Sequence, residues 1–223
     1  MLHRMSDNVK TVKEVFGERL KALREKAGLS QQEVAARVAE HGGTMHQTTI
    51  MRTEKGTRNV TLNEYVLLAA ALNVPPPMLL VPLGSEDRVE ITPRSRIHPH
   101  LALDWLTGDE CLTNTKRFVI DRGDWLRNAE PMFLWRKLRD LQEEQQAAAT
   151  GVKSAEYLGD DGRIRQARNA HAGALEALHA HLLKMQTAGE RPPGMHPQTV
   201  ADMSEIGLDV VGLPVWEDPE GDD

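Results

Sequence analysis

The sequence lacks the features of a secreted or membrane-embedded protein. Its 223 residues include one cysteine, Cys111, so no disulfide can form within the chain, whereas small secreted domains usually depend on several. No apolar run approaches the roughly 18 residues that mark a membrane-spanning helix, and no N-terminal stretch joins positive charge to an apolar segment. We therefore expect a cytoplasmic protein without a membrane partner.

Aromatic residues are also scarce, at 4% of the sequence. Hydrophobic residues make up 40% and charged residues 27%, which excludes a collagen-like or wholly disordered chain. The length fits two domains. Four tryptophans all lie after residue 81, where we expect them to pack in a core or interface, with the lining of a ligand pocket as the alternative: Trp105, Trp125, Trp135 and Trp216.

Positive charge is in deficit over the whole chain, but not evenly. The net charge is −6, which by itself argues against binding to nucleic acid, because phosphate neutralisation needs Lys and Arg gathered on one face. Residues 1–81 nevertheless contain 11 Lys and Arg against eight Asp and Glu, a net charge of +3. A nucleic-acid site is therefore expected in this N-terminal part.

Residues 11–81 have the pattern of a bundle of short helices. Apolar positions recur at spacings of three and four, and Ser30 with Glu33 and Thr61 with Glu64 have the spacing of capping boxes, which mark helix starts. Five helices are expected. They run from Thr11 to Ala27, from Ser30 to the glycines at 42 and 43, from Gln47 to Lys55, from Thr61 to Leu72 with Asn73 as the cap, and from Met78 to Leu80.

The rest of the chain is expected to be mainly helical, giving an all-α fold. Residues 82–98 are interpreted as a linker, with at most a brief strand from Arg88 to Thr92. Residues 99–188 are expected to form a helical dimerisation or regulatory domain, and 189–223 a Pro- and Gly-rich, acidic tail with one helix near Pro197 to Ile206. Within 99–188 we expect a short helix at 101–106, a longer one opened by Pro131, and a last one over 162–185. The apolar spacing of the last helix suits a helical hairpin or a dimer seam equally.

Three segments of the N-terminal part carry a family resemblance: LSQQEVAARV, HQTTIMRTEKG and NVTLNEYVLLAAALNVPPPMLL. Residues 11–81 resemble the helix-turn-helix family of lambda-type repressors and Cro proteins, also called the xenobiotic-response-element family. The resemblance implies a five-helix DNA-binding bundle. One departure is the turn between the second and third helices, Ala39 to Met45, which is longer than usual and contains two glycines.

The resemblance implies a set of DNA contacts on the helix from 47 to 55. Its N-terminal side chains should read base edges in the major groove, where each base pair shows a distinct donor and acceptor pattern. The expected base-reading residues are Gln47, Thr48 and Arg52, with His46 and Thr49 as further possible contacts. Gln31, Lys55 and Arg58 are expected to hold phosphates, which fix register without reading sequence. Arg24 and Glu54 are expected to form a structural ion pair.

No pattern in the sequence predicts catalysis, a cofactor or a metal. The pairs His98 and His100, and His179 and His181, lack the spacing and neighbouring ligands of recognisable zinc sites. No nucleophile-and-base constellation and no glycine-rich phosphate loop is found. A run of arginines at 163, 165 and 168 suggests either a second phosphate track or, more simply, a solvated helix face.

The sequence therefore predicts a non-enzymatic, sequence-specific transcriptional regulator, a repressor that is either a phage immunity repressor or a bacterial host regulator. It is expected to bind double-stranded operator DNA as a homodimer formed through its C-terminal helices. Two alternatives stay open. The first is an antitoxin-like or adaptor protein whose acidic helical half binds a protein partner, with the DNA module serving autoregulation. The second is regulation by a small molecule bound in the tryptophan-rich half.

Overall fold

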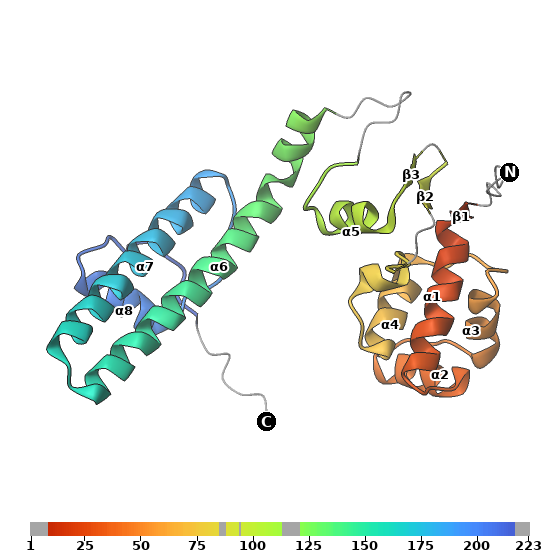
Figure 1. The fold of residues 1–223 in the computed structure, drawn as a ribbon, viewed down its shortest axis with the longest axis horizontal. Helices are drawn as coiled ribbons and strands as arrows, with labels where there is room; N and C mark the ends of the chain where they lie inside the picture. Colours follow the sequence, from red (N-terminus) through yellow and green to blue (C-terminus); the bar gives the residue numbers. More distant parts are fainter. Residues whose placement is uncertain (1–8, 85–87, 94, 113–120, 217–223) are drawn as a thin grey trace, which may run out of the picture. The chain divides into compact units, whose positions relative to one another are not determined.

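The computed structural model describes residues 9–84, 88–93, 95–112 and 121–216. The chain divides into two compact units, Met1–Trp125 and Leu126–Asp223, and each is treated by itself. The fold is mainly helical in both (Figure 1). No helix within the described ranges is long and apolar enough to cross a membrane. The five acidic residues at 217–223, part of the expected tail, lie outside the described residues.

The first unit contains the expected five-helix bundle. Its helices are α1 (Val12–Lys26), α2 (Gln31–Glu40), α3 (Gln47–Glu54), α4 (Leu62–Leu72) and the 3-10 helix η1 (Pro76–Leu79). Both predicted capping boxes form, and a third one starts α1. Asn73 ends α4 in the left-handed conformation, as predicted. The bundle closes around fully buried apolar side chains from every helix: Leu20, Val34, Val38, Ile50, Leu68 and Leu79.

The unusual turn between α2 and α3 is anchored at both ends. Gly42 adopts a left-handed conformation with φ of +77°, and the amide of Gly43 donates to the carbonyl of Val38 at 3.0 Å. This pattern stops a helix and reverses the chain. Met45 is buried in the core of the bundle just before α3 begins. The longer turn is thus fixed by packing, and α3 starts from a defined point.

The segment expected to be a linker is instead folded into the first unit. Strands β1 (Lys10–Thr11), β2 (Val89–Thr92) and β3 (Ser95–Ile97) form a sheet in the order β1-β2-β3, parallel and then antiparallel. Helix α5 (Pro99–Thr107) follows. Val81, Ile97 and Ala102 form a small core beside the sheet, because the short alternation of apolar residues finds partners that are distant in sequence.

The second unit is built on a hairpin of two long helices, α6 (Arg122–Leu158) and α7 (Asp161–Thr187) (Figure 1). Helix α6 begins nine residues before Pro131, which was expected to open it. Asp121 caps the new start by accepting a hydrogen bond from the amide of Asp124 at 3.1 Å. Pro131 lies within the helix and is exposed, so its missing N–H removes one helical hydrogen bond without burying an unpaired group.

The apolar stripe of α7 packs within its own chain. Leu175, Leu178, Leu182 and Met185 are buried against Leu134, Leu138 and Leu141 of α6. The hairpin therefore accounts for the spacing that a dimer seam would also have explained. The expected tail is likewise partly folded: α8 (Pro197–Glu205) packs on α7, and Met195, Met203 and Leu213 join the same core.

The tryptophans are less buried than the sequence suggested. Trp105 and Trp125 are half-buried, whereas Trp135 and Trp216 are 41% and 50% exposed. The indole N–H of Trp135 donates to a carboxylate oxygen of Glu190 at 3.0 Å. Indole combines a large apolar area with one polar tip, and composition does not reveal which side of it meets the protein.

Candidate nucleic-acid interface

Helix α3 separates its side chains into two faces. Ile50 and Thr53 are buried against the bundle; at 100° per residue, positions 48, 52 and 55 lie opposite them, and position 47 lies at the side, in the first turn. These four positions form what we call the outer face of α3: Gln47, Thr48, Arg52 and Lys55. All four are exposed. The helix predicted to read DNA therefore presents its polar side chains to solvent.

The other two candidates for base contact lie at the edge of the outer face. His46 is the N-cap residue of α3, and its side chain makes no capping hydrogen bond. It is exposed, whereas Thr49 is half-buried. The carbonyl of Thr49 accepts a hydrogen bond from the hydroxyl of Thr53 at 2.9 Å. Thr49 thus sits where α3 turns from solvent toward the core.

A close contact between α1 and α3 sets the position of the outer face. A Cβ atom added at Gly17 of α1 would lie 2.7 Å from the carbonyl oxygen of Thr53 and 2.8 Å from that of Glu54. Since both obstacles are backbone atoms, only glycine allows the two helices to approach this closely. Nothing in the sequence marks Gly17 as a contact point, because a glycine inside a helical pattern gives no sign of what it faces.

A buried carboxylate ties α3 to α1 and α2. Arg24 donates to Glu54 through Nε at 2.6 Å and Nη2 at 3.2 Å, and the two side chains are only 12% and 4% exposed. The hydrogen bond to Glu54 raises the pKa of the Arg24 guanidinium, outweighing its partial burial. Arg24 and Glu54 therefore form the structural pair that the family resemblance implied.

The same carboxylate also engages Gln31. The side-chain amide of Gln31 donates to Oε2 of Glu54 at 2.7 Å, which uses one of its two N–H donors. A buried carboxylate has several lone pairs to satisfy, and Gln31 at the start of α2 is the nearest neutral donor. In this conformation the side chain of Gln31 links α2 to α3, and its phosphate contact stays a prediction.

Arg58 is also held within the bundle. Its guanidinium donates to both carboxylate oxygens of Glu64 at 2.7 and 3.0 Å, and to the hydroxyl of Thr53 at 3.2 Å. Burial alone would raise the pKa of Glu64, but the hydrogen bonds from Arg58 and Thr61 outweigh it and lower the pKa. The expectation that Arg58 holds a phosphate therefore meets a competing contact with residues five and six positions away in the chain.

Arg52 and Lys55, the two cations of the outer face, differ from Arg58 in their surroundings. Among the described residues, no carboxylate lies within ion-pair distance of Arg52 or Lys55. Both side chains are exposed and keep their charge available for an external anion. The outer face thus combines amide and hydroxyl groups, which suit base edges, with unpaired cations, which suit phosphates.

The histidines of both pairs make hydrogen bonds within the fold. The ring Nε2 of His179 lies 2.6 Å from the carbonyl of Asp209, and that of His181 lies 2.9 Å from the carbonyl of Leu134. His98 and His100 approach each other through their Nδ1 atoms at 2.7 Å. No group of three or more potential metal ligands gathers within the described ranges.

The arginine run on α7 is partly paired. Arg168 donates to Glu156 of α6 at 2.7 Å, and Arg163 lies 3.5 Å from Asp160. Two of the three guanidinium groups therefore have carboxylate neighbours in the hairpin. This arrangement favours the solvated helix face over a second phosphate track.

The first unit has the architecture of a helix-turn-helix DNA-binding module. Residues 15–80 match a family described as a helix-turn-helix domain. Over 76 residues the chain is 38% identical to the control protein C.SmaI of Serratia marcescens, covering 34% of this chain and 84% of that protein. The chain belongs to the lambda-repressor-like, or xenobiotic-response-element, helix-turn-helix family of DNA-binding transcriptional regulators.

A solved relative is the restriction-modification controller protein C.AhdI of Aeromonas hydrophila. It is 35% identical, and the match covers 30% of this chain and 92% of that chain, with a TM-score of 0.27. The curated and the solved match each cover about a third of the present chain.

Proposed function

We propose that this protein is a sequence-specific transcriptional regulator that acts as a repressor by occupying an operator. Helix α3 would lie in the major groove, with Gln47 and Thr48 at base edges and Arg52 on guanine or a phosphate. Lys55 would hold a neighbouring phosphate. The two relatives are a control protein and a restriction-modification controller protein, which supports a regulatory role for the module they share with this chain.

One observation carries the proposal: the outer face of α3 is exposed and its cations are unpaired, while the opposite face is locked to α1 and α2. A side chain that reads base pairs must be held in register by a rigid support. Gly17 and the Arg24–Glu54 pair provide that support. Polar residues on an ordinary surface helix would need no such anchoring of the face beneath them.

Selection of bound duplexes from a random pool with the purified protein tests the proposal. We expect an inverted repeat with half-sites about 34 Å apart, bound with a dissociation constant on the order of 10⁻⁸ to 10⁻¹¹ M at physiological salt. Placing the recovered sequence across a reporter promoter should lower expression. Recovery of no preferred sequence would contradict specific reading by α3.

Variants of the outer face separate base reading from phosphate binding. Gln47→Ala should cost about 1–3 kcal/mol on the selected site and relax the preference at one base pair, with a smaller effect on random DNA. Lys55→Ala should weaken both DNAs equally and reduce the salt slope by about 1. Gln146→Ala, an exposed glutamine of α6, is the matched control. Equal losses on both DNAs for Gln47→Ala would refute its base-reading role.

We further propose that two copies bind the operator together, because one module contacts only a few base pairs. Helix α4 exposes Leu62 and Val66, one turn apart and 75% and 52% exposed. An adjoining groove is lined by Val60 and Tyr65, and among its described lining residues Lys13 is the single charged one. A nearly uncharged apolar surface meets its own copy without repulsion.

The C-terminal helices, from which the sequence predicted dimerisation, are the competing surface. They expose Met132, Trp135 and Leu183, although the stripe of α7 is already buried. Light scattering on Leu62→Ser/Val66→Ser and on Trp135→Ser/Leu183→Ser decides between the two surfaces. Loss of the dimer in the first variant alone assigns the contact to α4, and loss in the second alone assigns it to the C-terminal helices.

The adaptor alternative makes a different prediction. If the C-terminal unit served to bind a protein partner, deletion of residues 126–223 would leave operator binding by a dimer intact and would abolish capture of one specific protein. Under the repressor proposal, the full chain represses the reporter without any partner from its host. A purified transcription system that contains only polymerase, template and this protein distinguishes the two.

A further inference from the structure

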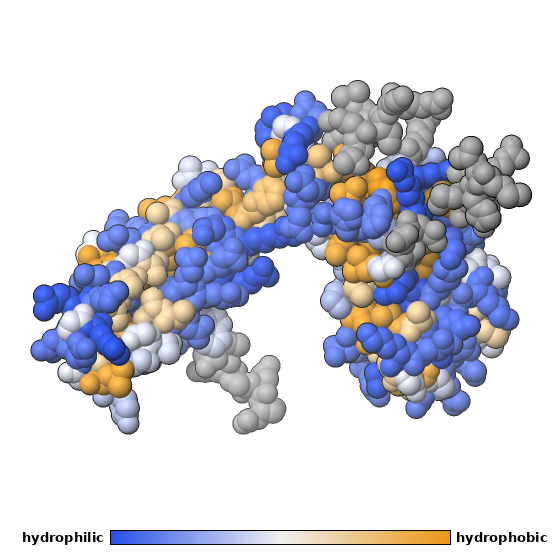
Figure 2. Space-filling view, in the orientation of Figure 1, coloured by the Kyte–Doolittle hydropathy of each residue, from blue (hydrophilic) through white to orange (hydrophobic). Residues whose placement is uncertain are grey.

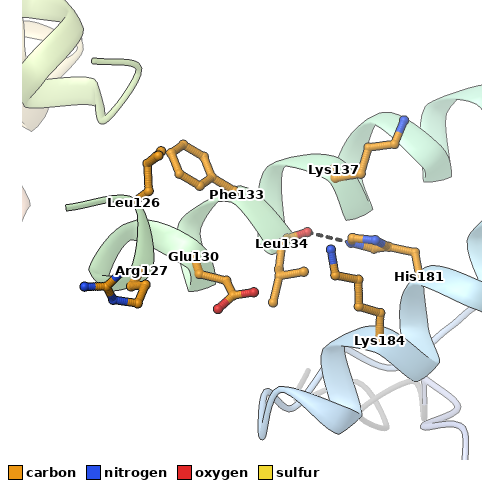
Figure 3. A pocket seen from close by; sticks show the side chains of 8 residues that line it. All are labelled: Leu126, Arg127, Glu130, Phe133, Leu134, Lys137, His181 and Lys184. Carbon is orange, nitrogen blue, oxygen red and sulfur yellow. Dashed lines mark hydrogen bonds between the residues drawn. The ribbon is translucent and has the colours of Figure 1, made fainter. Parts of the chain in front are cut away.

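The described residues of the second unit form a groove between α6 and α7 (Figure 3). Its volume is about 460 Å³, within the range of small-molecule sites. Leu126, Phe133 and Leu134 of α6 form an apolar side. Lys137 of α6 and Lys184 of α7 flank it from the two helices.

The charges around this groove are predominantly positive. Arg127, Lys137 and Lys184 line it together with a single carboxylate, that of Glu130. Within the described ranges, no carboxylate lies within ion-pair distance of Lys137 or Lys184. Both ammonium groups are carried on flexible four-carbon stems, so they can turn toward an anion that enters the groove.

His181 contributes a fixed polar wall. Its Nε2 lies 2.9 Å from the carbonyl oxygen of Leu134, an acceptor, so this nitrogen carries the proton and donates it (Figure 3). The contact joins α7 to α6 beneath the groove and holds the ring in one orientation. The groove is therefore bordered by a hydrogen-bonded imidazole, two lysines and three apolar side chains.

We propose that this groove binds a small amphipathic anion, namely a carboxylate joined to an apolar chain or ring. The apolar part would cover Leu126, Phe133 and Leu134, and the carboxylate would lie between Lys137 and Lys184. Apolar lining with a few convergent polar groups is the usual composition of a ligand site. This site is independent of the proposed reading of DNA by α3.

A second groove in the same unit shows what distinguishes the first. It lies among α6, α7 and α8 and is larger, about 650 Å³. Carboxylates predominate in its lining: Arg168 donates to Glu156 at 2.7 Å, and the imidazole of His171 lies 3.8 Å from Asp202. The first groove differs in the balance of its lining, one carboxylate against three Lys and Arg residues, whereas the second has three carboxylates against Lys153 and Arg168. Figure 2 shows hydrophobic residues lying among hydrophilic ones on the visible face of the hairpin.

A charge series on one apolar chain tests the proposal with the full-length protein. Octanoate, octan-1-ol and octylammonium share the chain and differ in the head group. Isothermal titration or equilibrium dialysis should rank them in that order of affinity. Because the groove is open to water, each lysine should contribute only two- to fivefold. The advantage of octanoate over octanol should shrink as salt is raised.

Variants assign the binding to this groove. Lys137→Gln/Lys184→Gln should weaken octanoate about tenfold, to the affinity of octanol, and leave octanol unchanged. Leu126→Ser should weaken all three compounds alike. Lys153→Gln, in the second groove, is the matched control and should change nothing.

Three results would overturn the proposal. The first is an affinity order that ignores the head group. The second is unchanged preference for octanoate in the double lysine variant. The third is no binding of octanoate or of a ring analogue, indole-3-propionate, at millimolar concentration. Circular dichroism on each variant shows that the hairpin is still folded, so a lost affinity is a property of the groove.

Discussion

Replacing Glu54 by glutamine is the sharpest test of how the α3 helix is held. Glu54 accepts hydrogen bonds from Arg24 at 2.6 and 3.2 Å and from Gln31 at 2.7 Å. The substitution keeps the shape of the side chain and removes its charge. An almost buried guanidinium is then left without its counter-ion, and removal of one partner from a buried pair costs about 3–5 kcal/mol.

The measurement is urea unfolding followed by circular dichroism, with hydrogen exchange of the α1 and α3 amides to assign the change to the first unit. Glu25→Gln is the matched control, because Glu25 also lies near Arg24, at 3.5 Å, but is 54% exposed. An exposed pair of this kind should contribute less than about 1 kcal/mol. We expect the two variants to differ by at least about 2 kcal/mol.

A second comparison separates the charge from the packing. Arg24→Met/Glu54→Met removes both charges and keeps most of the volume, so it should be less destabilising than Glu54→Gln alone. If Glu54→Gln were no more costly than Glu25→Gln, the carboxylate would not be the element that ties α3 to α1 and α2. The outer face of α3 would then not be held rigid by this ion pair.

Three further outcomes follow from the first unit and the hairpin. Gly17→Ala should destabilise the bundle by about 1–3 kcal/mol in urea unfolding, because the added Cβ meets backbone atoms. Gly151→Ala, with open space around it in α6, should stabilise its helix by about 0.5–1 kcal/mol, and equal effects of the two variants would contradict the close approach of α1 and α3. The hydrogen bond from the backbone amide of Ser30 lowers the pKa of Glu33 below its ordinary 4.5, so the ionised carboxylate stabilises the fold above pH 4.5 and this stabilisation is lost as the pH falls further. The thermal unfolding temperature should therefore depend less on pH between 6 and 3 in Glu33→Gln, and an unchanged pH profile would count against the capping box. Arg58→Met should lower the free energy of unfolding by about 1–2 kcal/mol, because Glu64 loses its partner, and should leave the salt dependence of DNA binding unchanged. A weaker salt dependence with unchanged stability would show instead that Arg58 contacts a phosphate.

Local patterns in the sequence determined much of the first unit. The capping boxes at Ser30 and Thr61 and the cap at Asn73 depend on side chains within three or four residues, and all three form. The same holds for the outward direction of Thr48 and Arg52, because helical periodicity alone places them opposite Ile50. The resemblance to the family added the roles of these positions.

Tertiary structure decided what depends on distant partners. Gly17 matters because another helix passes 2.7 Å from its missing Cβ. Gln31 turns inward because the fold brings Glu54, 23 residues away, to its side-chain amide. Strand β2 needs β1, nearly 80 residues earlier, as a hydrogen-bonding partner. A sequence shows which groups are able to pair, and only the packed chain, which must satisfy every buried charge and fill every gap, decides which of them do.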